Sequence, residues 1–163
     1  MKTPLPRKVI AAIALFGLAS GCFALEFRNT SWLMTGSDVI ASEPGRVVSE
    51  QSYAAQHQIL FRSVVNGYTA TITYLLENDR LLSASYTFNK DVAGKAFEAM
   101  KQDLIAKNGA PSVQTDTLLA WRLVRTEIAL THLADGTTQA GYWEKAYFAQ
   151  INNLSAASIA PKK

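Results

Sequence analysis

A regular alternation of apolar and hydroxyl-bearing side chains in two neighbouring segments is the feature that most constrains the fold. From Tyr68 to Leu76 every second residue is apolar and threonines lie between most of them, and Leu82 to Phe88 repeats the pattern. Because successive side chains of a strand point to opposite faces, each segment predicts a strand with one apolar and one polar face. Such strands are typical of an antiparallel sheet that is covered on one side.

Turn signals connect these segments to further strands. A predicted strand over residues 57–65 enters Asn66-Gly67, a dipeptide typical of type I′ hairpins, and Asn78-Asp79 marks a second turn. Three more strands are predicted over 118–124, 126–133 and 137–143. The sequence therefore predicts two three-stranded meanders, about six strands in total.

Three helices are predicted around these meanders. The clearest is Asp91–Asn108, where apolar residues recur with the helical period. A short helix around Val39 is expected to be capped by Thr35 or Ser37, and a last amphipathic helix covers Glu144–Leu154. We therefore expect an α+β domain with its helices packed on one face of the sheet.

The N-terminus has the three-part form of a secretory signal: a basic start, the ten apolar residues 9–18, and a small-residue region up to Ala24. A ten-residue helix spans only about 15 Å, half of a bilayer's hydrocarbon thickness. Two kinds of processing remain open. Residues 1–24 are removed as a signal peptide, or residues 1–21 are a lipoprotein signal and Cys22 is lipidated, since Ala19-Ser20-Gly21-Cys22 resembles a lipobox.

These features predict a periplasmic protein or, alternatively, one that is lipid-anchored in the outer membrane through Cys22. We expect a single domain over residues 25–155, a flexible tail over 156–163, and no transmembrane helix in the mature chain. Basic and acidic residues are equal in number once the basic leader is removed, which argues against a nucleic-acid partner. Cys22 is the only cysteine, so no disulfide is expected.

No catalytic or metal-binding motif is present in the sequence. His57 and His132 are the only histidines, and they form no recognised ligand spacing. There is no Gly-x-Ser-x-Gly elbow and no phosphate-binding glycine loop. We therefore expect no enzymatic activity, cofactor or metal. The acidic pairs that could be nominated for glycoside hydrolysis fit roles at helix starts and in turns: Asp38 with Glu43, and Asp79 with Asp135.

Aromatic residues offer a better indication of function. Trp32 and Trp121 are expected to pack in the core, because Trp32 precedes the first helix and Trp121 alternates with leucines. Tyr142, Trp143 and Tyr147 cluster in the sequence at a strand-to-helix corner. We predict that these three residues form a contact patch.

The run Trp32 to Val39 resembles the opening segment of the SmpA/OmlA (BamE) family. Met34, Thr35 and Val39 match the family pattern, whereas Leu33 replaces its glycine, and Glu43-Pro44-Gly45 stands in place of its Leu-Gly-x-Pro. That family consists of small envelope lipoproteins whose helices pack on an antiparallel sheet and which assist outer-membrane protein assembly. The chain is also similar in pattern to the β-lactamase-inhibitor-like architecture. Both resemblances imply a non-catalytic binding role, and neither assigns a functional residue.

Three functions stay open from the sequence. The first is a non-enzymatic envelope protein that binds another envelope or periplasmic protein in an accessory, inhibitor or immunity-type role. The alternatives are a small-molecule or glycan binding module and an enzyme without a recognisable motif. A cleft with converging polar groups would favour the second function, and a flat face with exposed aromatic residues would favour the first.

Overall fold

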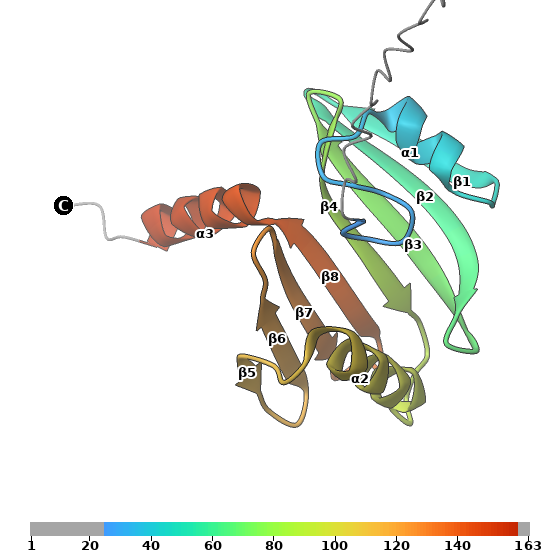
Figure 1. Ribbon diagram of the computed structural model, residues 1–163, viewed down its shortest axis with the longest axis vertical. Coiled ribbons are helices and arrows are strands. Elements are labelled where there is room, and N and C mark those ends of the chain that lie inside the picture. The colour runs from blue at the N-terminus through green and yellow to red at the C-terminus, as the bar shows by residue number, and fades with distance from the viewer. Residues whose placement is uncertain (1–24, 160–163) are drawn as a thin grey trace, which may run out of the picture.

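The computed structural model describes the backbone of residues 25–159 and the side chains of residues 25–153 (Figure 1). Cleavage after Ala24 and lipidation of Cys22 therefore concern residues outside the described range. The chain forms an α+β fold, as the sequence predicts. Its elements are α1 (Gly36–Ser42), β1 (Val47–Tyr53), β2 (Gln56–Val65), β3 (Tyr68–Glu77), β4 (Arg80–Phe88), α2 (Lys95–Asn108), β5 (Val113–Gln114), β6 (Leu118–Arg122), β7 (Thr126–His132), β8 (Thr138–Glu144) and α3 (Lys145–Ile159).

All strands belong to one antiparallel sheet with the order β1-β2-β3-β4-β8-β7-β6-β5. Each half of the chain contributes a helix followed by a four-stranded meander, and the last strands of the two meanders, β4 and β8, join the halves. The sheet thus has eight strands, and the prediction of about six is wrong. The two missed strands carry little signal, because β1 is mostly polar and exposed and β5 has only two residues.

The turn and helix predictions agree with the structure in most respects. Asn66 and Gly67 have φ angles of 51° and 85°, as a type I′ turn requires. Thr35 caps α1 by accepting a hydrogen bond from the Asp38 N–H. The second helix begins at Lys95 rather than Asp91, because residues 92–94 form a turn in front of it.

A β-bulge in β4 changes which leucine enters the core. The pairing shifts from Leu75 with Ser83 to Leu76 with Leu81, so that Leu82 is the extra residue. Leu81 is fully buried and Leu82 is only partly so, which corrects the expectation that Leu82 faces the core. In addition, the backbone of Leu81 forms hydrogen bonds with the backbone of Leu33 and Met34.

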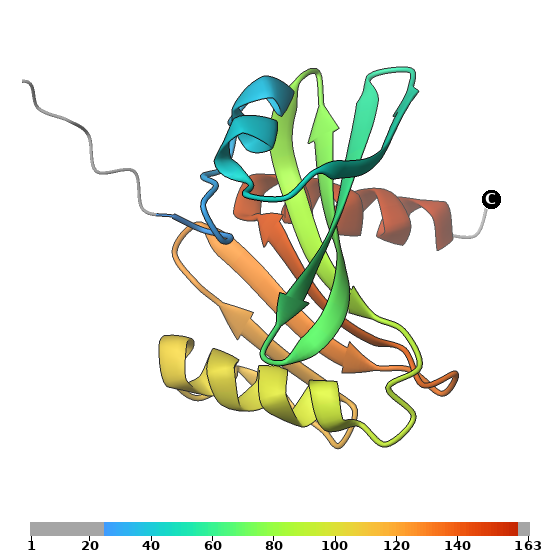
Figure 2. The same ribbon diagram turned by 90° about the vertical axis from the view of Figure 1, so that its right-hand side faces the viewer.

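One face of the sheet carries the core. Residues 25–34, which we call the N-terminal segment, α1 and α2 all lie on this face (Figure 2). Phe27 packs against three tyrosines, and the Trp32 indole donates a hydrogen bond of 2.9 Å to the Thr126 hydroxyl of β7. Trp121 is buried as expected, and its indole N–H donates to the Gly109 carbonyl.

The helix α3 differs from the other two. It follows β8 directly and extends away from the sheet (Figure 1), so it is not packed with α1 and α2 on the core face. It continues to Ile159 and thus includes residues 156–159, which were expected to belong to a tail. No helix among the described residues has the length and apolar character needed to cross a membrane.

Candidate functional site

The structure does not bring the three residues of the expected contact patch together. Tyr142 is 8 % exposed and packs against Phe27 and Tyr86 on the core face. Its neighbour Trp143 faces the opposite side and contacts Phe148 of α3. Because adjacent residues of a strand point to opposite faces, Tyr142 cannot share a surface with Trp143 and is not part of the patch.

Tyr147 lies on the same side of the sheet as Trp143. It lies at the start of α3 and is partly buried. Burial, together with the charge of Glu77 at the end of β3, raises the pKa of Tyr147. The first turn of α3 therefore rests near the edge of the sheet face that points away from the core, which we call the outer face.

Uncharged residues form the centre of the outer face. The strand register defines a central row that crosses the whole sheet from β1 to β5 and contains no charged side chain. The row consists of Ser49, Leu60, Thr73, Ser85, Gly141, Ala129, Ala120 and Val113.

Charged residues lie beside this row rather than within it. Trp143 folds back over Gly141, where a Cβ atom would overlap the indole ring. In the row that contains Trp143, Glu127 lies opposite Trp143 on the neighbouring strand and forms an ion pair of 3.9 Å with Arg122. Half of the next row toward the other end of the strands is threonine, and Arg62 lies at its margin.

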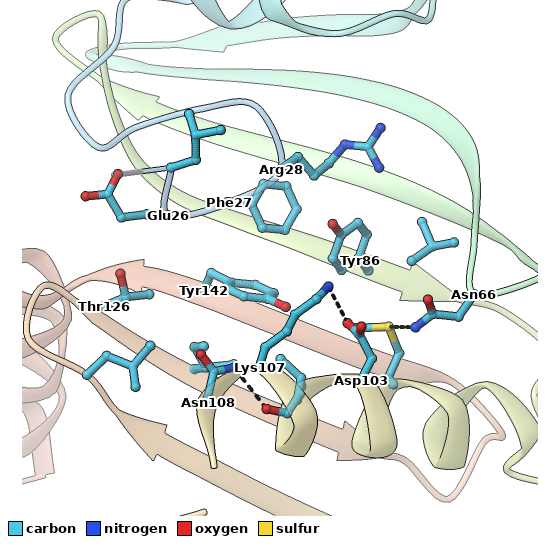
Figure 3. A pocket seen from close by; sticks show the side chains of 16 residues that line it. Glu26, Phe27, Arg28, Asn66, Tyr86, Asp103, Lys107, Asn108, Thr126 and Tyr142 are labelled. Carbon is cyan, nitrogen blue, oxygen red and sulfur yellow. Dashed lines mark hydrogen bonds and ion pairs between the residues drawn. The ribbon is translucent and has the colours of Figure 1, made fainter. Parts of the chain in front are cut away.

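A second candidate site is a cleft of about 460 Å³ on the core face (Figure 3). Its walls are the start of the N-terminal segment, the β2–β3 hairpin and α2, and its floor comes from β4, β7 and β8. Its lining includes Glu26, Phe27, Arg28, Tyr86, Asp103, Lys107, Asn108, Thr126 and Tyr142.

Arg28 is anchored in the upper wall by a buried carboxylate. Its Nε donates to Glu43 Oε1 at 2.8 Å, and the Tyr74 hydroxyl donates to the same oxygen. The side chains of Arg28 and Glu43 are 17 % and 2 % exposed. Burial alone would lower the pKa of Arg28, but the Glu43 carboxylate outweighs it and the pKa is raised. Glu43 lies at the C-terminal end of α1, just before the bend at residues 44–45, and it is buried there, which the sequence did not indicate.

Two tyrosines form the floor of the cleft. Tyr86 and Tyr142 are each 8 % exposed. Burial raises the pKa of both hydroxyls, and the Asp103 carboxylate raises them further, whereas Arg28 acts in the opposite direction on Tyr86. Both phenols consequently stay protonated and can donate a hydrogen bond.

The charged groups around the cleft are paired with one another. Lys107 Nζ lies 2.8 Å from Asp103 Oδ2 on successive turns of α2. Glu26 accepts the Trp32 N–H and forms an ion pair of 2.9 Å with Arg125. With the Arg28–Glu43 pair, each of these charges has an opposite charge beside it.

The histidines and the other nominated acids lie apart from both sites. His57 pairs with Glu50 at 3.2 Å, and His132 shares a hydrogen bond of 2.8 Å with Thr138. Asp38, Asp79 and Asp135 occupy a helix start or turns, and the latter two accept the N–H groups of Gly36 and Thr137. Residues 25–153 contain no cluster of three or more His, Cys, Asp or Glu side chains that could hold a metal ion.

Sequence reasoning missed the residues of the cleft. Arg28, Tyr86 and Asp103 come from three distant parts of the chain, and no local motif connects them. The sequence feature that could have indicated the cleft is the charged residue Arg28 directly after the core residue Phe27.

Comparison with known proteins adds no assignment: no protein-family model, curated protein or solved structure matches this chain.

Proposed function

We propose that this chain is a non-enzymatic protein of the bacterial envelope that binds another protein on the outer face of its sheet. Export through residues 1–24, or anchoring through Cys22, is part of this proposal and rests on the sequence alone. The observation that supports the binding role is the uncharged central row, which runs across every strand.

The composition of the row favours contact with protein. Charged residues are depleted at the centres of protein interfaces, and desolvating serine, threonine and alanine costs far less than desolvating lysine or glutamate. The partly buried Leu60 and Leu75 add apolar area on the first half of the sheet. We expect a partner that presents a folded, uncharged and mostly apolar surface.

The helix α3 extends the proposed binding surface. After Lys145 it contains no charged residue up to Ile159, and it projects beside the outer face (Figure 1). Trp143 and Phe148, whose ring centroids are 5.5 Å apart, lie where the helix and the face meet. Trp143 and Tyr147 thus remain in the proposed contact patch, now together with the central row.

The test introduces a charge into the row on each half of the sheet. We would make Thr73→Glu and Ala129→Glu, which are partly buried positions on the outer face, and the matched control Gln102→Glu, an exposed position on α2. Each tagged variant is crosslinked in the envelope of its host, and the captured proteins are quantified by mass spectrometry.

We expect one dominant, salt-resistant partner whose recovery falls at least about tenfold with either outer-face substitution, because an unpaired charge would be buried in the interface. The Gln102→Glu control should still recover the partner. Equal recovery by all variants would refute the outer face as the binding surface. Absence of any enriched partner, with a folded and exported bait, would refute the protein-binding function.

A further inference from the structure

The cleft on the core face is a second site, separate from the proposed protein-binding surface. We infer that it binds a neutral, polyhydroxylated ligand of the size of a mono- or disaccharide. The inference stands on the size of the cleft, the charge balance of its walls and the hydrogen-bonding groups that face it (Figure 3). It does not depend on the protein-binding proposal.

The size suits a small ligand. A volume of about 460 Å³ falls in the range of small-molecule sites and exceeds what a few water molecules need. Fixed elements form the walls, since Arg28 is held by Glu43, and Phe27 is packed against Tyr86 and Tyr142. The site is therefore already formed without a ligand.

The charges favour a neutral ligand. Arg28 is neutralised by Glu43, Lys107 by Asp103, and Glu26 by Arg125. A charged ligand would enter a site where each of these cations and anions already has a partner, and its own desolvation would not be compensated. A neutral ligand avoids that cost.

The hydrogen-bonding groups favour hydroxyls in particular. The Tyr142 hydroxyl makes no hydrogen bond within residues 25–153, and Tyr142 lines the cleft. Burial raises the pKa of both floor tyrosines, so both hydroxyls stay donors. The Asp103 carboxylate on the α2 wall is an acceptor, as is the Asn108 side-chain oxygen. A sugar hydroxyl donates and accepts at once and can bridge such groups.

Apolar side chains complete the fit. Leu25, Val65 and Leu123, which are exposed or partly exposed, lie among the polar groups of the lining, and the buried Phe27, Met100, Leu104 and Ile128 support them from below. The C–H faces of a sugar ring can pack on such side chains while its hydroxyls reach the tyrosines and α2.

The test is a titration monitored by the ring resonances of Tyr86 and Tyr142 in the purified, isotope-labelled protein. The probes are glucose, galactose, mannose and N-acetylglucosamine with their disaccharides, and the charged analogues glucosamine and glucuronate. We expect at least one neutral sugar to give saturable shifts with a Kd on the order of millimolar, since a few neutral hydrogen bonds drive binding. Tighter binding of a disaccharide than of its monosaccharide would indicate that the natural ligand is part of a polysaccharide. Equal binding of the two would indicate a free sugar.

The matched variants are Tyr142→Phe and Tyr147→Phe, which remove one hydroxyl inside and one outside the cleft. Tyr142→Phe should weaken sugar binding about fivefold, and Tyr147→Phe should leave it unchanged. Because Asp103 is on the surface of α2, Asp103→Asn gives a second test that leaves the core intact, with Glu98→Gln as its control.

Two results would overturn the inference. The first is no saturable shift of either tyrosine with any neutral sugar up to about 100 mM, a concentration far above a millimolar Kd. The second is binding of glucosamine or glucuronate as tight as that of the neutral sugars. Thr73→Glu should leave sugar binding unchanged, so this inference and the protein-binding proposal can fail separately.

Discussion

The two halves of the chain build the same unit from unequal parts. In the first half, β2, β3 and β4 have 10, 10 and 9 residues, and α1 has only 7. In the second half, β6, β7 and β8 have 5, 7 and 7 residues, and α2 has 14. The half with the larger sheet area therefore has the smaller helix.

The N-terminal segment makes up for this difference. Val39 is the buried apolar side chain of α1, whereas α2 buries Phe97, Met100 and Leu104. Phe27 and Trp32 cover the part of the first half that α1 does not reach. The cleft lies between this segment and α2, above Tyr86 and Tyr142. The cleft therefore exists because the N-terminal segment and α2, which cover the two halves unequally, do not meet above β4 and β8, where the halves join.

The largest expected effect on stability comes from removing the side chain with which the N-terminal segment covers the first half of the sheet. Phe27→Ala should lower the free energy of unfolding by about 3–5 kcal/mol, because a buried ring that contacts three tyrosines leaves a cavity. Urea denaturation measures the change. The nearby Leu25 is 63 % exposed, and Leu25→Ala should change stability by no more than about 0.5 kcal/mol. Equal losses in both variants would mean that the segment does not act as a core element.

The second prediction concerns the ion pair that holds the segment. Glu43→Gln should cost about 2–3 kcal/mol, because Arg28 loses its anionic partner while the amide oxygen can still accept from Tyr74. The matched change on α2 is Glu98→Gln, which breaks an exposed pair with Lys101 and should cost less than about 0.5 kcal/mol. Chemical denaturation of both variants checks the contrast, which an equal cost would contradict.

Features of this fold that depend on local sequence are predictable, and features that depend on pairing between distant segments are not. The α+β class, the Asn66-Gly67 hairpin and the helix α2 were predictable, because each depends on a local periodicity or a turn residue. The edge strand β1 was not, since most of its residues are exposed and polar and only pairing with β2 holds it.

The candidate sites divide in the same way. Strand alternation already implies that Tyr142 and Trp143 face opposite sides, so the outer face was within reach of the sequence. The cleft was not, because residues 28, 86 and 103, which line it, come from distant parts of the chain and meet only in the folded structure. The bulge at Leu82 likewise depends on the pairing of Leu81 with the N-terminal segment.

A third prediction compares one turn from each half. Gly67 and Gly136 both have positive φ angles, of 85° and 77°. A Cβ at Gly67 meets nothing within 4 Å, whereas one at Gly136 would lie 3.2 Å from the Val92 backbone. Gly67→Ala should therefore cost about 1 kcal/mol from backbone strain alone, and Gly136→Ala about 2 kcal/mol. Thermal unfolding of the two variants measures the difference, and a larger loss at Gly67 would contradict it.

The smallest expected effect concerns how the helix of each half is capped. Thr35 caps α1 with a neutral hydroxyl, whereas the Asp91 carboxylate accepts the N–H groups of Ala96 and Phe97 at the start of α2. Burial alone would raise the pKa of Asp91, but the Thr138 hydroxyl and these two N–H groups outweigh it, so the pKa is lowered.

A lowered pKa in the folded state means that Asp91 adds stability above its unfolded pKa of about 3.9, and that this stability is lost as the pH falls through the lower folded value. At pH 7, Asp91→Asn and Thr35→Ala should each cost about 1 kcal/mol. Below about pH 4 the deficit of Asp91→Asn should shrink, while that of Thr35→Ala stays constant. Urea midpoints between pH 7 and 3 measure both deficits. A constant deficit for Asp91→Asn would mean that the charge of Asp91 does not stabilise α2, and that the two helices are capped in equivalent ways.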